Sequence, residues 1–221
     1  MTGFDLDGLT TFLSRRSDDI VDLVVDHLVV VLISLALAAV IGIGLGIAVR
    51  NRRFARSAVI TASAVAITIP SLALLALLSP VLGLGWTPTV VALVFYSLLP
   101  IVRNTVVGLR EVPVSVLEAA RGVGMGSARV LLTVQLPIAW PVILAGVRVA
   151  AQLTVGIAAI AAYVAGPGLG EYIFKGLSSL GSKNALNYAL VGTVAVILLA
   201  LLLDGIFVLI SRFTTSRGLR A

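Results

Sequence analysis

The chain has no cysteine and a single histidine, His27. Disulfides, thiol catalysis and zinc sites built from clustered Cys and His side chains are therefore excluded. Charged residues are scarce as well, at 12% of the 221 residues, whereas soluble domains carry about a quarter. Hydrophobic residues make up 59%. Because a fold with so little charge cannot cover its surface in water, the apolar excess is expected to face lipid.

Aromatic residues are also few, at 6%, and no polar segment combines a basic patch with interleaved aromatic side chains. The formal net charge of +6 therefore does not indicate nucleic-acid binding. The basic residues lie in short gaps between long apolar runs, a distribution that is typical of membrane proteins anchored at their cytoplasmic face.

Long uncharged runs predict an all-α integral membrane protein with five spans. About 20 predominantly apolar residues cross the hydrocarbon core of a bilayer. The fourth run is expected to start earlier, near Trp140, and the fifth to continue to Ile210. The second and third are expected to meet in a turn at Ser79-Pro80 and the following glycines. The runs are Leu28–Val49, Ser57–Ser79, Val81–Val102, Val149–Gly170 and Asn184–Leu203.

The arginines predict the orientation, with the N-terminus outside and the C-terminus in the cytoplasm. One set of gaps between spans holds eleven of the 16 basic residues and the opposite set holds four, so the richer set is placed in the cytoplasm. The predicted parts are an extracytoplasmic segment over 1–27, a transmembrane domain over 28–211 with a cytoplasmic loop at 103–136, and a cytoplasmic tail over 212–221. His27 is expected at the membrane boundary, without a special role.

The loop at 103–136 has the features of a structured element. Ser115, followed three residues later by Glu118, is a capping-box pattern that predicts a helix start after Pro113. Three alternate glycines from Gly122 to Gly126 are expected to end this helix and to turn the chain. Helical propensity resumes from Ser127 to Gln135. The sequence therefore predicts a short helix that projects into the cytoplasm between two spans.

Residues of this loop resemble a known signature. Glu118-Ala-Ala120, Gly124 and then Val134-Gln-Leu-Pro137 match the spacing of the EAA motif of permease subunits of bacterial ABC importers, with Val134 where isoleucine is commonest. The resemblance implies the five-span type I ABC importer permease fold. It also implies that the chain is a transport subunit in the cell membrane and not an enzyme.

The resemblance further implies that the loop couples this chain to a separate ATPase subunit. Small Ala119 and Ala120 would allow close approach to that subunit, and Glu118 is expected to form local hydrogen bonds rather than to touch nucleotide. The chain has no Gly-x-x-x-x-Gly-Lys-Ser/Thr phosphate loop, so no cofactor is expected on this chain, and ATP and Mg²⁺ are expected on the ATPase. The implied coupling residues are Glu118, Ala119, Ala120, Arg121, Gly122 and Gly124.

A wider resemblance, from Asp26 to Gly218, is to osmoprotectant permeases. It implies import of glycine betaine, choline, carnitine or proline betaine, and partnership with a second identical or homologous permease, two ATPase subunits and an extracytoplasmic binding protein. One alternative is a permease for methionine or polar amino acids, which shares the five-span core. Another, of a different class, is an ion-driven secondary transporter. The resemblance rests on Ile69–Leu74, Leu99–Thr105, Leu136–Arg148 and Gly166–Gly170.

Candidate functional residues also lie within the spans. Pro70 and Pro100 are expected to kink their helices; together with Ser71, Tyr96 and Tyr163 they are candidates for the pathway or its gate, the alternative being purely structural kinks.

Two charges lie inside the predicted spans. Arg148 and Asp204 are each about 12 Å inward from the cytoplasmic ends of their helices. Because isolated charges at that depth are costly, we hypothesise that they pair between the fourth and fifth spans. The alternative is that Arg148 extends to the membrane surface.

Overall fold

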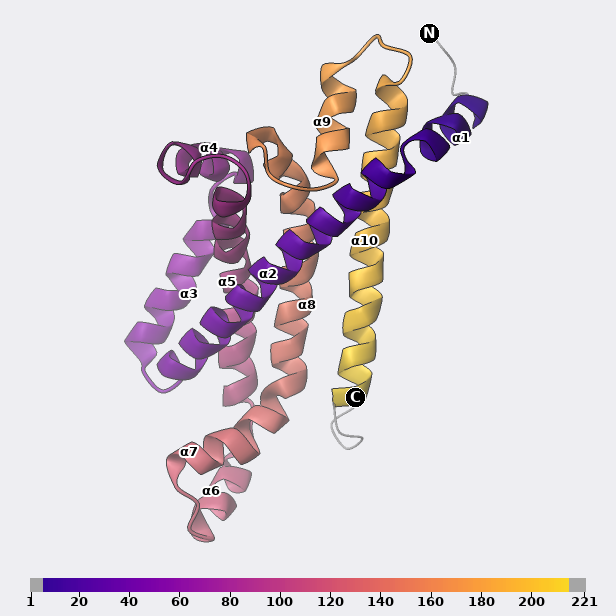
Figure 1. The fold of residues 1–221 in the computed structure, drawn as a ribbon. Coiled ribbons are helices and arrows are strands. Elements are labelled where there is room, and N and C mark those ends of the chain that lie inside the picture. The colour runs from indigo at the N-terminus through magenta and orange to yellow at the C-terminus, as the bar shows by residue number, and fades with distance from the viewer. Residues whose placement is uncertain (1–5, 215–221) are drawn as a thin grey trace. The chain divides into compact units, whose positions relative to one another are not determined.

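A computed structural model describes residues 6–214, and every regular element within them is helical (Figure 1). The first five residues of the predicted extracytoplasmic segment and most of the predicted cytoplasmic tail lie outside the described residues. The helices are α1 (Leu6–Arg15), α2 (Ser17–Val49), α3 (Arg53–Thr68), α4 (Ser71–Leu82), α5 (Trp86–Arg110), α6 (Val114–Gly122), α7 (Ser127–Val130), the π-helical η1 (Leu131–Gln135), α8 (Leu136–Ala161), the 3-10 turn η2 (Ala162–Val164), α9 (Gly170–Ser178) and α10 (Ala185–Thr214).

Among the described residues, four helical stretches are long and apolar enough to cross a membrane: α2, α5, α10 and the run Ser127–Val164 that contains α8. A fifth crossing is possible only if α3 and α4 are taken together, and these two helices are bent by 96° at the break between them. Pro70 lies at this break. Its ring disfavours helical geometry in the preceding residue, so the predicted second span is a broken helix rather than a kinked one.

Two other helix ends differ from those predicted. The turn expected at Ser79-Pro80 and the following glycines is confined to the glycines, because α4 continues through Pro80 to Leu82. The chain turns at Gly83 and Gly85, whose φ angles of +80° and +92° suit residues without a Cβ. In addition, α2 begins at Ser17, so that the first apolar run continues a helix that starts among acidic residues.

The described chain forms two compact units. In each, segments distant in sequence pack around their own apolar clusters. One unit contains residues up to Ser34, Ile69–Val94 and Gln152–Leu203; the other contains Leu35–Thr68, Phe95–Ala151 and residues from Asp204.

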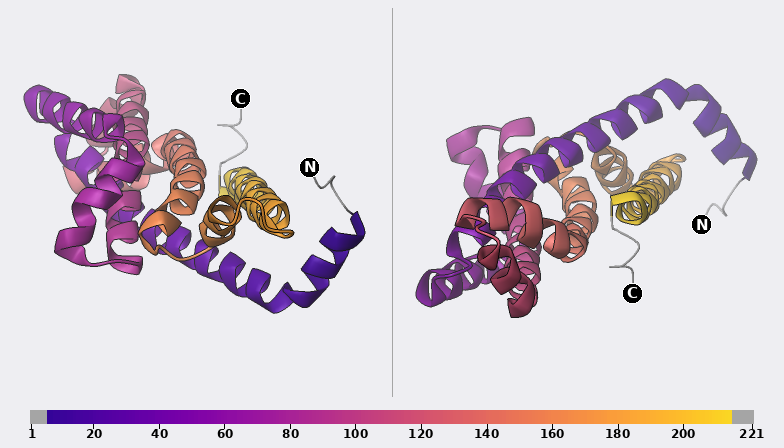
Figure 2. Two further views of the ribbon diagram at one scale, coloured as in Figure 1. Left: turned by 90° about the horizontal axis from the view of Figure 1, so that it is seen from above. Right: turned by 90° about the horizontal axis from the view of Figure 1, so that it is seen from below.

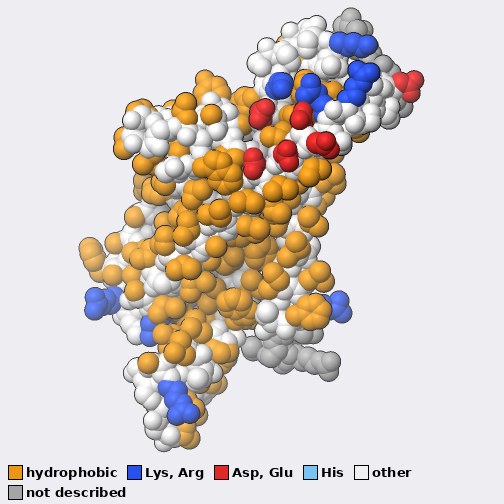
Figure 3. Space-filling model, in the orientation of Figure 1, with side chains coloured by type: hydrophobic (Ala, Val, Ile, Leu, Met, Phe, Trp, Pro, Cys, Tyr) orange, Lys and Arg blue, Asp and Glu red, His pale blue; other side chains and the backbone are white. Residues whose placement is uncertain are grey.

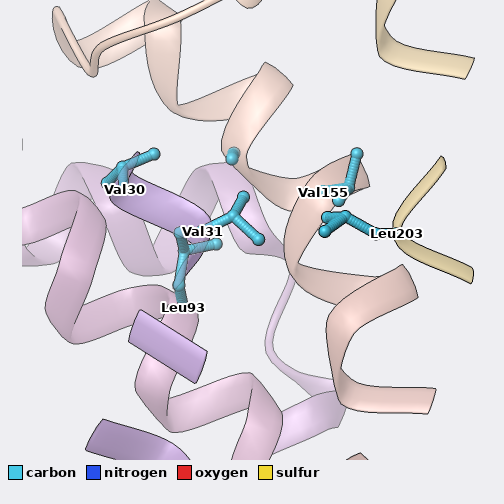
Figure 4. Packing of buried hydrophobic residues seen from close by; sticks show 6 residues of the cluster. Val30, Val31, Leu93, Val155 and Leu203 are labelled. Carbon is cyan, nitrogen blue, oxygen red and sulfur yellow. The ribbon is translucent and has the colours of Figure 1, made fainter. Parts of the chain in front are cut away.

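The core of the first unit joins four helices. Val30 and Val31 of α2, Leu93 of α5, Val155 of α8 and Leu203 of α10 are at most 5% exposed and form one cluster (Figure 4). The four helices are therefore held together by the close packing of these side chains.

In the same unit α9 lies beside the first turns of α10 (Figure 2). The two helices approach closely at glycines. A Cβ on Gly176 would lie 2.7 Å from the Ala185 carbonyl oxygen, and one on Gly192 would lie 3.0 Å from Tyr172 Cβ.

The second unit positions α8 through close contacts with α5. A Cβ on Gly108 would lie 3.0 Å from the Ala139 carbonyl oxygen, and one on Gly146 would lie 2.6 Å from Asn104 Cβ. Val102 and the neighbouring residues of α5 also pack against α2 and α3. Small residues at helix contacts let the helices approach closely. Such packing is expected in a membrane, because lipid provides no hydrophobic drive for helix association.

Exposed carboxylates gather over α1 and the beginning of α2 (Figure 3). Asp18, Asp22 and Asp26 are four residues apart and therefore share one face of α2. Val29 and Leu32, farther along the helix, are exposed apolar side chains. The change from acidic to apolar exposure along one helix marks where it leaves water and enters the bilayer.

Candidate functional site

The loop between α5 and α8 contains the predicted short helix, α6. It begins at Val114, with Pro113 at its N-cap and no side-chain capping hydrogen bond. The capping box predicted for Ser115 and Glu118 is therefore wrong. Pro113 suffices to start the helix, because its fixed φ is already close to the helical value and an N-terminal position needs no N–H donor.

The turn that follows α6 is closed by backbone groups. Gly124 has a φ of +83°, which only glycine adopts without strain. The Val123 N–H donates to the Ala119 carbonyl at 3.1 Å and the Met125 N–H to the Ala120 carbonyl at 3.1 Å. Most of the implied coupling residues lie on the surface of this turn: Ala120 is buried, whereas Glu118, Ala119, Arg121, Gly122 and Gly124 are exposed.

The second half of the loop contains a π-helical turn. The chain resumes as α7 and then widens into η1, in which the Leu136 N–H donates to the Leu131 carbonyl. Helical structure was predicted here but its π geometry was not. Val134 and Gln135 of the signature lie in this turn, with only Leu136 between them and Pro137, which lacks the N–H that a regular helix would use. Such π-bulges are frequent at functional sites.

The structure brings Arg148 and Asp204 together. Arg148 Nε donates to Asp204 Oδ1 at 2.6 Å and Arg148 Nη2 donates to Asp204 Oδ2 at 2.6 Å. This two-bond arrangement between a guanidinium and a carboxylate is a strong, directional form of ion pair. The pair joins α8 to α10, and 40% of the Arg148 side chain and 26% of the Asp204 side chain remain exposed.

The other candidates fall in both units. Pro70 is exposed at the start of α4, and Ser71 follows it half-buried. Tyr163 is 63% exposed and its ring lies 5.7 Å from that of Phe174. In the second unit, Tyr96 is 3% exposed. Pro100 is buried within an unbroken α5.

His27 has a structural role that sequence reasoning missed. The side chain is 0% exposed. The Leu169 N–H donates to Nδ1 at 3.3 Å, so Nε2 carries the proton and donates to the Val155 carbonyl at 3.2 Å. A Cβ on Gly168 would lie 2.6 Å from His27 Cβ. His27 therefore links the segment 166–170 to α2 and α8 through hydrogen bonds and close packing. The prediction that it has no special role is wrong.

Sequence reasoning also missed an aromatic cluster in the first unit. The rings of Phe12 and Tyr188 lie 4.8 Å apart, and those of Tyr172 and Tyr188 5.1 Å apart. Arg16 lies 5.1 Å and Lys175 5.0 Å from the Tyr188 ring centroid, so cations of the chain itself already occupy the ring faces. Burial raises the pKa of the Tyr172 hydroxyl.

Residues 38–216 match the family of inner-membrane components of binding-protein-dependent transport systems. The chain belongs to this family. It is therefore a membrane translocation component, a permease subunit of an ABC importer, and not an enzyme. Its partners, in general terms, are another permease subunit, an ATPase on a separate chain and a substrate-binding protein.

Two curated relatives match this permease over nearly its whole length, and a third over part of it. It is 35% identical over 212 residues, 96% of each chain, to OpuCB, a permease protein of the glycine betaine/carnitine/choline transport system of Bacillus subtilis. It is equally similar, with the same coverage, to OpuBB, a permease protein of the choline transport system of that organism. Over 137 residues, 62% of this chain and 56% of the relative, it is 46% identical to OsmY, an osmoprotectant import permease protein of Salmonella typhimurium.

The fold of the permease is also that of a solved transporter. A chain of the MetNI methionine ABC transporter, in an inward-facing conformation, superposes with a TM-score of 0.76. The match covers 89% of this chain and 96% of that chain at 23% identity. The likeness establishes the predicted all-helical importer fold.

Proposed function

We propose that this permease carries osmoprotectants across the cell membrane, with glycine betaine, choline, carnitine and proline betaine as the substrate class. The observation that carries the proposal is the 35% identity, over 96% of both chains, to permease proteins named for glycine betaine, carnitine and choline transport. A methionine or polar amino-acid substrate has weaker support, because the methionine transporter chain is only 23% identical.

The proposed coupling element is the turn formed by α6 and Gly124. It supports docking because its exposed surface consists of small and charged residues, Ala119 and Arg121 among them, over which the groove of another protein can close. Val114 and Val123 add apolar side chains that are 67% and 75% exposed. Two ATPase subunits, which hold ATP and Mg²⁺, would each receive one such turn from a pair of permeases.

The second permease can be identical or homologous. OpuCB and OpuCD of Bacillus subtilis are permease proteins named for one transport system. The chain is 35% identical to OpuCB over 212 residues and 40% identical to OpuCD over 137 residues, 62% of this chain. In the proposed orientation, with the N-terminus outside and α6 in the cytoplasm, ATP binding draws the two α6 turns together and opens the path outward. An extracytoplasmic binding protein delivers the substrate, and hydrolysis reverses the movement.

Uptake of labelled glycine betaine tests the substrate class. The permease and its partner subunits would be expressed in a strain without its own osmolyte importers, with unlabelled choline, glycine betaine or methionine as competitor. The proposal predicts uptake that choline reduces and methionine does not. Competition by methionine alone would contradict it, and uptake that persists without the ATPase would contradict the ATP-driven class.

A charge reversal in α6 tests the coupling element. Arg121→Glu changes an exposed side chain in the proposed contact with the ATPase, and Arg53→Glu is the matched control at an exposed position in α3. We expect the first variant to lose at least ~1.4 kcal/mol, or about tenfold, in ATPase affinity, measured by co-purification over a range of ATPase concentrations. If both variants retain the ATPase equally, α6 is not part of the interface with the ATPase.

A further inference from the structure

The Arg148–Asp204 pair is unusual because it is charged, lies within apolar spans and is only partly enclosed. Both residues belong to stretches that qualify as membrane spans. Yet 40% of one side chain and 26% of the other remain exposed. Hydrocarbon is a costly environment for an ionised group. The exposed part of the pair must therefore face water or another protein.

The surroundings of the pair support this conclusion. Ala145, one turn before Arg148 on α8, is exposed. On α10, no atom outside the helix lies within 4 Å of the position that a Cβ on Gly205 would take. Farther along α10, exposed side chains are large and apolar: Leu209 is 53% and Phe213 82% exposed. Small residues thus adjoin the two charges, and the exposed apolar side chains of Leu201 and Val208 lie one turn away from Asp204 on the same helix.

The chemistry of the pair matches that of a betaine. A guanidinium binds a carboxylate through two parallel hydrogen bonds, as Arg148 does with Asp204. A substrate that joins a quaternary ammonium group to a carboxylate carries the same two charges. It can place its carboxylate on Arg148 and its cation beside Asp204, so that neither protein charge is left without a counter-charge during exchange.

We propose that Arg148 and Asp204 form a transient substrate site in the translocation path, at which a zwitterionic quaternary ammonium compound exchanges its charges with those of the ion pair. The proposal rests on the proposed function and names the part of the path that recognises the substrate. Such a site has a low affinity for its substrate, because binding must first break an existing ion pair. Weak binding suits release toward the cytoplasm.

A purely structural pair makes a different prediction. Replacing a buried ion pair by apolar residues of similar volume is often neutral or stabilising. The variant Arg148→Met with Asp204→Leu would then transport normally. If the pair is a substrate site, the same variant assembles but loses at least ~tenfold in the rate of uptake per transporter, because it offers two apolar groups to a zwitterion.

A second variant separates the two charges of the substrate. Arg148→Lys keeps the positive charge and its attraction to Asp204 but loses the two-bond fork. It should raise the KM for glycine betaine about tenfold, with little change in kcat. The KM for choline, which has no carboxylate, should stay the same.

The test uses the complete transporter in proteoliposomes with internal ATP and its binding protein, and labelled glycine betaine or labelled choline outside. Arg53→Gln, at an exposed position in α3, is the control for loss of an arginine. Normal uptake of both substrates by the apolar double variant would overturn the proposal. If that variant does not assemble, Arg148→Lys decides: equal shifts in both KM values would overturn the proposal, and a shift for glycine betaine alone supports it. Wild-type transporter that imports neither substrate would refute the proposed function itself.

Discussion

Two polar features within the apolar spans of this permease differ in how they are enclosed. In one unit, His27 is 0% exposed and its ring bonds to two backbone groups, the Leu169 N–H and the Val155 carbonyl. In the other, Arg148 and Asp204 are charged, bond to each other and remain 40% and 26% exposed. A neutral group whose hydrogen bonds are all internal serves the fold. Charges left partly open within a membrane indicate a surface that meets water, a partner or a substrate.

The comparison predicts the largest effect for breaking the ion pair from one side. Arg148→Ala leaves Asp204 without its guanidinium and should cost about 2–3 kcal/mol, below the range for a fully buried pair, because both side chains are partly exposed. The readout is the unfolding midpoint of the purified transporter in detergent.

Reversal of the pair is the matched control. Arg148→Asp with Asp204→Arg restores opposite charges across the same helix contact, and we expect it to recover much of the stability that either single reversal loses. A double variant no more stable than the single ones would show that the contact between the two charges does not stabilise the fold.

A smaller loss is expected where the His27 junction is tightest. Gly168 has a φ of +106°, and a Cβ there would lie 2.6 Å from His27 Cβ. Gly168→Ala should therefore cost about 2 kcal/mol more than a change that imposes the backbone strain alone. Gly181→Ala provides that reference, because Gly181 has a φ of +93° and open space around it. Equal unfolding midpoints for the two variants would show that the close contact between residue 168 and His27 does not add to the cost of the substitution.

The smallest single loss is expected for His27→Asn, and its comparison with His27→Leu distinguishes the two hydrogen bonds of His27. His27→Asn keeps an acceptor near the position of Nδ1 for the Leu169 N–H and loses only the bond to Val155, at a cost of about 1 kcal/mol. His27→Leu loses both bonds and leaves a buried N–H without a partner, for roughly 2–3 kcal/mol. The two unfolding midpoints test this order. Equal losses would mean that the Leu169 bond contributes nothing.

The parts of the fold that follow from composition could be predicted from the sequence. Apolar runs predict the spans, since a bilayer imposes their length. The meeting of Arg148 and Asp204 followed from the cost of isolated charges at depth. The turn after α6 followed from the alternating glycines, and its positive-φ residue is Gly124.

The rest depends on contacts that no local pattern records. The partners of His27 are backbone atoms of residues 155 and 169. Every residue has such atoms, so the sequence does not indicate which of them His27 contacts. Phe12, Tyr172 and Tyr188 come from three different helices. The break at Pro70 was predicted as a kink, because sequence indicates that proline interrupts a helix but not by what angle.

One measurement tests the distinction between the two features most directly: the rate of labelled glycine betaine uptake per assembled transporter in proteoliposomes. Two variants would be compared, His27→Asn and the apolar replacement Arg148→Met with Asp204→Leu. We predict that the first keeps the wild-type rate per transporter while its unfolding midpoint falls, and that the second unfolds near the wild-type midpoint while its rate falls. The opposite pattern, in which the apolar variant transports normally and His27→Asn does not, would contradict the account.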